Sequence, residues 1–295
     1  MQGNCSRPFN STEKNDSNFL QFESNVNFDQ AIAFEIAISV VNAFFSFTAL
    51  LGNSALLMTI WKTSSLHSPA NILLTSLAVS DFAVGLLIQP LFIAVIQSGL
   101  ISTIILVFNF LVYFFCCASF MTITVIALDR LLILQLHLRY HSVVTTVRVT
   151  LVVIFIWILS AVNTFLLMTS SRFRLVFLVT IISLLAGNLV VYFKIYAIAR
   201  RHQRQIQQQL ASNENIFRVT RYTKTAFNSF LVYIVLLCCY MPYSFVSLYG
   251  RVFGVIVYWT YVTVTLVFIN SSLNPLLYCW RDREIRTAMK RLFCR

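Results

Sequence analysis

Long apolar runs alternate with short polar segments along the chain after its first 30 residues. A transmembrane helix needs about 20 mostly apolar residues. Seven windows reach this length: 31–61, 70–97, 102–136, 147–169, 173–199, 223–249 and 253–279. Such runs favour helices over the alternating strands of a membrane barrel. The pattern predicts an all-α membrane protein built as a seven-transmembrane helix bundle, with the bundle occupying residues 31–279.

Two boundaries between these windows depend on few residues. Between Ala70 and Leu128 the only charged side chain is Asp81. A single helix cannot hold so long a run in one bilayer, so the break at 97–99 is predicted from length. The fourth and fifth windows are separated only by residues 170–174, which predicts an outer loop of five residues.

The two ends of the chain differ from the bundle. Residues 1–30 are polar, lack the apolar region of a cleaved signal peptide and hold three glycosylation sequons, at Asn4, Asn10 and Asn15. We expect an extracellular glycosylated tail. Residues 280–295 carry apolar side chains at helical spacing opposite basic ones, which predicts a short amphipathic eighth helix on the cytoplasmic membrane surface. Cys294 then is a candidate palmitoylation site, against the alternative of an unmodified thiol.

The chain has few charged residues, and most of them are basic. Charged residues make up 11% of the sequence, against about 25% in soluble domains, and the net charge is +12. Most Lys and Arg residues fall in the segments that would be cytoplasmic, so the positive-inside rule places the N-terminus outside and the C-terminus inside the cell. We therefore expect a multi-pass plasma-membrane protein whose basic face contacts anionic lipids, and no nucleic-acid partner.

Polar residues within the apolar windows indicate where function lies. A charge at a helix centre costs about 2.5–3.5 kcal/mol on insertion scales, and Asp81 stands halfway along its window, whereas Glu35 lies near the end of the first. Oxygen-bearing side chains at similar depth are Asn53, Ser119, Asn270, Ser271 and Asn274. They predict either a hydrogen-bonded network or a site for a small hard cation, and the sequence leaves both open.

Two further features concern helix ends and bends. Pro275 removes a backbone donor and predicts a bend beside Asn274. Asp129 and Arg130 lie near the inner end of the third window. Because they are sequence neighbours, their side chains do not face each other on a helix. Arg130 either points inward under the bundle or extends with Asp129 to the membrane edge.

Seven short motifs follow one another in order along the windows. They are Gly52-Asn53, Leu77-Ala78-Val79-Ser80-Asp81, Asp129-Arg130-Leu131, Trp157, Tyr192, Cys239-Tyr240-Met241-Pro242 and Asn274-Pro275-Leu276-Leu277-Tyr278. With them the chain resembles the rhodopsin-like (class A) G-protein-coupled receptors over residues 31–293. Residues 138–148 look like melanocortin receptors, whereas 81–90 and 192–205 look more like adenosine receptors.

The resemblance implies a function and assigns residues to it. Ligand binding in the outer half of the bundle would move the sixth helix and admit a heterotrimeric G protein. The residues implied in activation and coupling are Asp129, Arg130, Tyr192, Tyr240, Pro242, Asn274, Pro275 and Tyr278. The family's sodium pocket maps onto Asp81, Ser119, Asn270, Ser271 and Asn274, so sodium is expected as an allosteric ligand, with no required cofactor.

The chain also departs from the family pattern. Leu184 and Leu236 replace a proline and a phenylalanine, and Tyr240 replaces a tryptophan, so the middle of the activation relay is altered. Tyr222 stands where some members carry an acid that pairs with the arginine of the third helix, and we hypothesise appreciable basal signalling. Ile105 replaces the usual third-helix cysteine, so the common loop disulfide is not expected.

The resemblance reduces the number of ligand classes that fit the chain, but it does not identify the ligand. Val112 replaces the aspartate of amine receptors and Phe268 the lysine of opsins; Ser247 replaces a purine-binding asparagine; Leu91, Ile105 and Asn109 replace three calcium-binding acids. The implied pocket positions are Val112, Tyr113, Cys116, Tyr240, Tyr243, Ser244, Ser247, Val264 and Phe268. Their neutral character favours a lipid or small neutral molecule as the ligand. The basic outer residues Arg172, Arg174 and Arg251 leave an acidic ligand or a peptide as an alternative.

Other classes of protein fit the sequence less well. A polytopic transporter or channel would be expected to show internal repeats or rings of charge, and neither is seen. A receptor-like protein that has lost G-protein coupling is a further alternative. The chain lacks the common hydrolase and metalloprotease motifs, so no enzyme activity is expected.

Overall fold

The structure is a computed structural model, and it describes residues 28–98, 102–136, 139–169, 171–208, 233–250, 252–254, 257–281 and 283–293. The sequons at Asn4, Asn10 and Asn15 lie outside these residues, as do Tyr222 and Cys294. The expectations for those five positions therefore stay predictions.

The described residues form helices of very different lengths. In chain order they are α2 (Phe28–Lys62), η1 (Ser64–Leu66), α3 (Pro69–Ala83), η2 (Val84–Ile88), α4 (Gln89–Ser98), α5 (Ser102–Leu136), α6 (Tyr140–Val143), α7 (Thr146–Thr169), α8 (Ser171–Gln208), α10 (Val257–Arg281) and α11 (Arg283–Phe293). A further helix runs through Tyr233–Gly250 and is here named the sixth span. Seven helical stretches in this part of the chain are long and apolar enough to cross a membrane, which confirms the predicted fold class.

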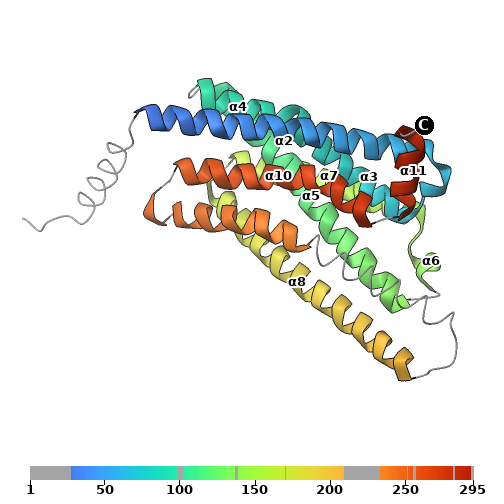
Figure 1. Cartoon of the computed structure of the whole chain (residues 1–295). Helices are drawn as coiled ribbons and strands as arrows, with labels where there is room; N and C mark the ends of the chain where they lie inside the picture. Colours follow the sequence, from blue (N-terminus) through green and yellow to red (C-terminus); the bar gives the residue numbers. More distant parts are fainter. Residues whose placement is uncertain are drawn as a thin grey trace, which may run out of the picture.

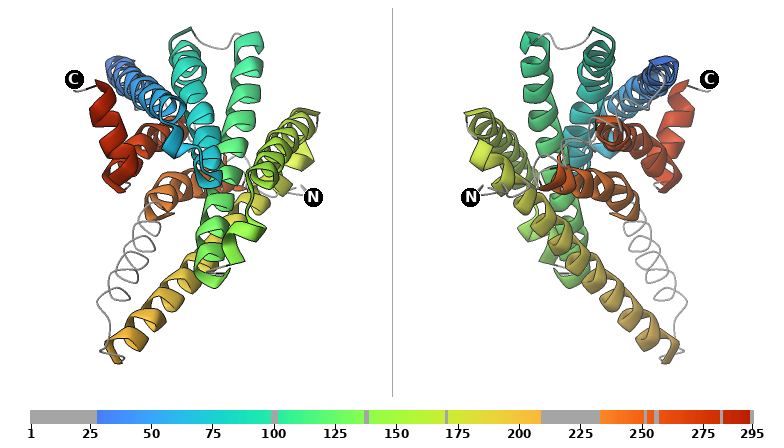
Figure 2. Two further views of the ribbon diagram at one scale, coloured as in Figure 1. Left: turned by 90° about the vertical axis from the view of Figure 1, so that its right-hand side faces the viewer. Right: turned by 90° about the vertical axis from the view of Figure 1, so that its left-hand side faces the viewer.

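The helices pack side by side as a bundle (Figures 1 and 2). α5 packs against α3, α7 and α8, while α2 packs against α10 and α3. The short α6 and the terminal α11 lie at the same end of the bundle, which is here named the α6–α11 end (Figure 1). α8 runs obliquely away from the other helices toward this end.

The distribution of side chains suits a lipid solvent. Large apolar residues on the outer faces are exposed, among them Phe44, Phe155 and Phe193. The interior instead contains buried polar groups that bond between helices: the Trp157 indole donates to the Ser76 hydroxyl at 3.0 Å. Because lipid gives helices no hydrophobic reason to associate, packing and such hydrogen bonds hold the bundle together.

The second span changes to a π-helical turn, η2, at Val84–Ile88, between α3 and α4. Gly85 lies in this turn against α2, and its carbonyl accepts a 2.7 Å hydrogen bond from the Ser46 hydroxyl. A Cβ at Gly85 would lie 3.0 Å from both the Ala49 Cβ and the Ser46 carbonyl oxygen. Close approach of the two backbones therefore requires glycine here.

We predict that Gly85→Ala destabilises the bundle by about 1–3 kcal/mol, the usual cost of overpacking an interior. The matched control is Gly187→Ala on α8, where an added Cβ meets nothing within 4 Å. The control is expected to be neutral or slightly stabilising, because alanine favours helix over glycine. Melting temperatures in detergent measure both variants, and equal melting of the two would contradict the packing argument.

The connection between the fourth and fifth spans is shorter than the sequence suggested. α7 runs to Thr169 and α8 begins at Ser171, so the predicted five-residue loop at 170–174 is wrong. Residues 171–174 contain no glycine or proline, and serine, arginine and phenylalanine all allow a helix. The helix therefore begins before the apolar run does.

The predicted eighth helix is present as α11. The Ile285 side chain is fully buried, and α11 packs on α2 and α10. The Cys279 thiol lies 3.6 Å from the Met289 sulfur. The helix is thus fixed to the end of α10 on its apolar side. The described cysteines, in the spans at positions 116, 117, 238, 239 and 279, are all free.

Candidate functional site

Asp81 lies at the centre of a buried polar cluster between α3, α5 and α10. Its side chain is 0% exposed. Asn274 donates to one carboxylate oxygen at 2.7 Å, and the Ser119 hydroxyl reaches the other at 3.5 Å. The Ser271 hydroxyl also hydrogen-bonds the carboxylate. Residues from two other helices thus converge on the acid of α3, as their depth in the sequence predicted.

Asn53 and Asn270 take different places around this cluster. The Asn53 amide donates to the Ala49 carbonyl at 2.9 Å and to the Ser271 carbonyl at 3.2 Å, so it joins α2 to α10. Asn270 is buried, but it is not among the groups that hydrogen-bond Asp81. The structure therefore brings together four of the five expected pocket residues in direct hydrogen bonds, with Asn53 as a support that fixes the backbone of α10.

The oxygen-bearing side chains around Asp81 are of the kind that bind a small hard cation. The described residues contain no group of three or more His, Cys, Asp or Glu side chains that would hold a transition metal. One carboxylate with neutral hydroxyl and amide oxygens instead suits a small cation that prefers oxygen ligands. Pro275 follows directly within α10, where a Cβ on Gly52 of α2 would approach its ring at 3.0 Å.

The α6–α11 end of α5 carries Asp129 and Arg130. Asp129 is buried, and one of its carboxylate oxygens accepts a 2.6 Å hydrogen bond from the Tyr140 hydroxyl of α6. Burial raises the pKa of Tyr140, and the hydrogen bond and charge of Asp129 raise it further. Tyr140 therefore stays a protonated donor at physiological pH. The sequence analysis did not anticipate this contact, because Tyr140 lies on a separate short helix.

Arg130 is held differently from its neighbour. Its side chain is half-buried, and its Nε is buried without a hydrogen-bond partner among the described residues. The neighbouring Asp129 carboxylate hydrogen-bonds with Tyr140. An uncompensated buried donor is costly, so the guanidinium retains hydrogen-bonding capacity for a further partner.

We predict that Tyr140→Phe lowers the free energy of unfolding by about 1.5–3 kcal/mol, because it leaves the buried Asp129 carboxylate without its donor. The matched control is Tyr196→Phe on α8, where the tyrosine is 49% exposed, and it is expected to change little. Thermal melting in detergent compares the two variants. A Tyr140→Phe protein as stable as the control would show that the bond contributes nothing.

The remaining residues assigned to activation also occupy helix interiors. Tyr192 of α8 is buried and stacks on Tyr233 of the sixth span, with ring centroids 4.8 Å apart. The Tyr233 hydroxyl donates to the Leu185 carbonyl at 2.5 Å, so the two helices are joined here. Tyr278 is buried on α10. The Tyr192–Tyr233 stack is a packing contact that the sequence analysis missed.

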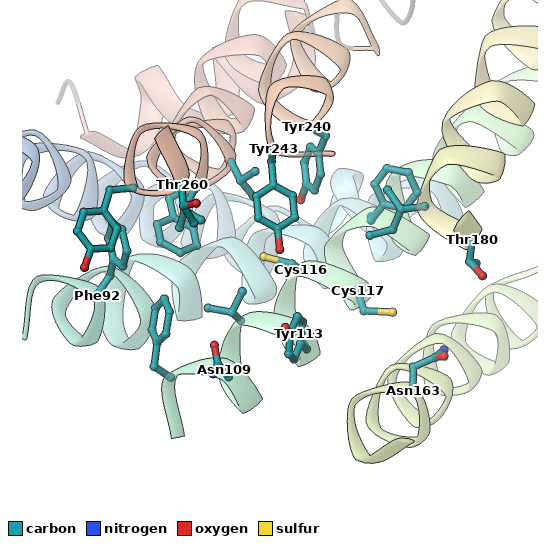
Figure 3. Close-up of a pocket in the computed structure, with 18 of the residues that line it drawn as sticks. Phe92, Asn109, Tyr113, Cys116, Cys117, Asn163, Thr180, Tyr240, Tyr243 and Thr260 are labelled. Atoms are coloured by element: carbon teal, nitrogen blue, oxygen red, sulfur yellow. The ribbon is translucent and has the colours of Figure 1, made fainter. Parts of the chain in front are cut away.

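Nearer the opposite end, the bundle encloses an apolar cavity of about 270 Å³ (Figure 3). Seven of the nine expected ligand-pocket positions line it: Val112, Tyr113, Cys116, Tyr240, Tyr243, Val264 and Phe268. Ser244 and Ser247 do not; the Ser244 hydroxyl instead donates to the Tyr240 carbonyl at 3.0 Å. None of the lining residues that the structure describes is acidic, basic or a histidine.

The lining includes residues that the sequence analysis did not assign to it. Phe92 of α4 contacts Phe108, Tyr261 and Phe268 at centroid distances between 5.5 and 5.8 Å. Others lie on α5, α7 and α8, namely Asn109, Cys117, Phe120, Met121, Asn163, Thr180, Ile181 and Leu184. Their apolar or small side chains are common in any span, so only the packing of the helices identifies them.

The floor of the cavity adjoins the relay residues. Tyr240 is buried, its ring lies 5.6 Å from that of Phe120, and its hydroxyl hydrogen-bonds with the Cys116 thiol. Phe120 follows Ser119, which contacts Asp81. A ligand in the cavity would therefore press on side chains one residue away from the polar cluster.

Comparison with known proteins agrees with this geometry. A family model described as 7 transmembrane receptor (rhodopsin family) matches residues 52–175. The Histamine H2 receptor of Cavia porcellus is 28% identical over 298 residues, covering 88% of this chain and 80% of that receptor. The human Histamine H2 receptor is 27% identical with similar coverage. Melanocortin receptor 3 of Homo sapiens is 26% identical over 83% of this chain and 82% of that receptor. The likeness to melanocortin receptors was expected, and that to histamine receptors was not.

Proposed function

The chain belongs to the rhodopsin-like (class A) family of G-protein-coupled receptors, and we propose that it transmits the binding of a neutral ligand in its apolar cavity to a heterotrimeric G protein. One observation carries this proposal. α5 supplies Val112 and Cys116 to the cavity, Ser119 to the Asp81 cluster and Arg130 to the α6–α11 end. A single helix thus joins a ligand site to a coupling site.

The proposed orientation places the α6–α11 end in the cytoplasm. The exposed Lys62, Arg139 and Arg283 all lie at or next to this end, and basic residues flanking the spans mark the cytoplasmic side. The N-terminal tail with its sequons would then be extracellular. The G protein would bind at the α6–α11 end, near Arg130.

The proposed ligand is neutral. An amine such as histamine, after which the H2 receptors are named, would bring a positive charge into the cavity. Val112 and the other described lining residues provide no carboxylate to offset it, and an unpaired buried charge is strongly unfavourable. The aromatic and hydroxyl groups of Tyr113 and Tyr243 suit an apolar molecule with a hydrogen-bonding group.

We further propose sodium as an allosteric ligand of the Asp81 cluster. Asp81, Ser119, Ser271 and Asn274 would supply its oxygens. If that packing exists only in the inactive receptor, sodium shifts the population toward inactivity by its difference in affinity for the two states. Replacement of Asp81 provides the test of this part.

The function is tested by nucleotide exchange on purified G proteins of each family, with membranes that contain the wild-type chain or its Arg130→Ala variant. Each is assayed with and without panels of neutral lipids and small metabolites. Exchange above the Arg130→Ala background under any condition supports the proposal. Exchange no higher than that of membranes without the receptor under every condition would mean a receptor-like protein without coupling, and ion flux without coupling would favour a transporter or channel.

A further inference from the structure

One end of the apolar cavity lies between α7 and α8, away from the aromatic cluster around Phe92. Asn163 of α7 and Thr180 of α8 line this end (Figure 3). Asn163 lies six residues before the end of α7, and Thr180 nine residues after the start of α8. At about 1.5 Å per residue these positions are roughly 9 and 14 Å from the helix ends. Both fall within a hydrocarbon layer of about 30 Å.

At this point the lining of the cavity includes a residue of the outer surface of the bundle, from which we infer an opening between α7 and α8. Among the described lining residues Thr180 alone is exposed, and the others are buried or half-buried. The neighbouring side chains on the same two helices are exposed and apolar, including Phe165 at 66%, Val179 at 54% and Ile182 at 40%. Such a surface faces acyl chains, so the opening leads into lipid.

The chemistry of this opening differs from that of the surrounding surface. Asn163 places a primary amide beside it and hydrogen-bonds no other described residue. An amide left without a partner in hydrocarbon costs free energy. A ligand that offers both a donor and an acceptor would satisfy it. Met121, Ile181 and Leu184 add apolar side chains to the lining of the cavity.

We propose that the ligand is a neutral lipid of the monoacylglycerol type that enters from the bilayer between α7 and α8. Its hydroxyl-bearing head group binds the Asn163 amide, and its acyl chain passes Leu184 toward Tyr240 and Phe268. This inference rests on the proposed function, because it names the ligand class of the same cavity. The described lining residues offer no charge to a phosphate or ammonium head group, which would lie unpaired beside them in an apolar medium.

The route is tested with a monoacylglycerol that carries a diazirine in its acyl chain, incorporated into nanodiscs with the purified full-length chain. On illumination we expect labels on the α5 residues that line the cavity, between Val112 and Met121. Asn163→Trp fills the opening and should reduce this labelling more than tenfold. The matched control Phe165→Trp enlarges a lipid-facing side chain on the same helix outside the cavity lining and should change labelling less than twofold.

The head-group chemistry is tested with variants and probes that keep the opening free. Asn163→Leu removes the amide at similar volume and should lower labelling about three- to tenfold, the loss of one or two hydrogen bonds. Probes with the same acyl chain but a phosphate or an amine head group should label the cavity at least tenfold less than the neutral one. Size-exclusion profiles establish that each variant is folded.

The results separate this inference from the proposed function. Labelling confined to the outer faces of α7 and α8, or cavity labelling that Asn163→Trp leaves unchanged, overturns lateral entry. Equal labelling by the phosphate or amine probe overturns the neutral ligand class. Photolabelling requires no G protein. Uptake of the neutral lipid without nucleotide exchange would therefore support the lipid site and contradict the proposed coupling function. Nucleotide exchange without lipid uptake would support coupling and contradict the lipid site.

Discussion

Arg130→Ala is expected to lower G-protein nucleotide exchange at least about 30-fold, to the level of membranes without the receptor. A central arginine in a protein interface commonly contributes 2 kcal/mol or more to binding. Arg130 fits that role because its Nε is buried and has no partner among the described residues. Its guanidinium therefore gains hydrogen bonds when a G protein binds at the α6–α11 end, and alanine offers none. Exchange of labelled guanine nucleotide on the G protein measures the effect.

Two controls separate this role from charge and from folding. Lys62→Ala removes an exposed basic residue at the same end of the bundle and should reduce exchange less than threefold. Arg130→Lys keeps the charge but not the planar fork of donors, so it should recover only a small part of the activity. Full activity in Arg130→Ala would mean that the G protein is engaged without this side chain.

The fold follows from the sequence because its signals are local. Each span is a run of apolar residues long enough for one bilayer crossing, and Ile285 and its neighbours repeat at helical spacing. The missed start of α8 at Ser171 has a local cause as well. Hydropathy records where a helix enters lipid, and it carries little information on where the helix begins outside it.

The polar cluster could also be predicted, for a different reason. A charged side chain such as Asp81 is so costly in a span that its partners must lie at the same depth, and Asn274 does. Contacts of residues that are not costly to place in or near a span could not be predicted from the sequence. Tyr140 bonds to Asp129 from a separate short helix, and Asn163 joins Thr180 at the cavity only because α7 and α8 pack together. The type of such a residue in the sequence does not identify the residue on another helix that it will contact.

Asp81→Asn is expected to abolish the effect of sodium on the receptor. In wild type, sodium bound at Asp81 should raise the free energy of unfolding by about 1.4 kcal/mol at ten times its dissociation constant, and it should weaken agonist binding by favouring the inactive packing. Asparagine keeps the size of the side chain and can still bond with Ser119 and Asn274, but it offers a cation no charge. The variant should therefore be at least as stable as wild type without sodium, because a neutral buried group costs less.

Melting in sodium chloride against N-methylglucamine chloride at equal ionic strength measures this difference. The control is Glu35→Gln, which neutralises the half-buried acid of α2 outside the cluster and should leave the sodium shift unchanged. A sodium shift that survives in Asp81→Asn would place the cation elsewhere. Loss of the shift in both variants would instead indicate a general response to the charge of the bundle, because Glu35 is not among the groups that hydrogen-bond Asp81.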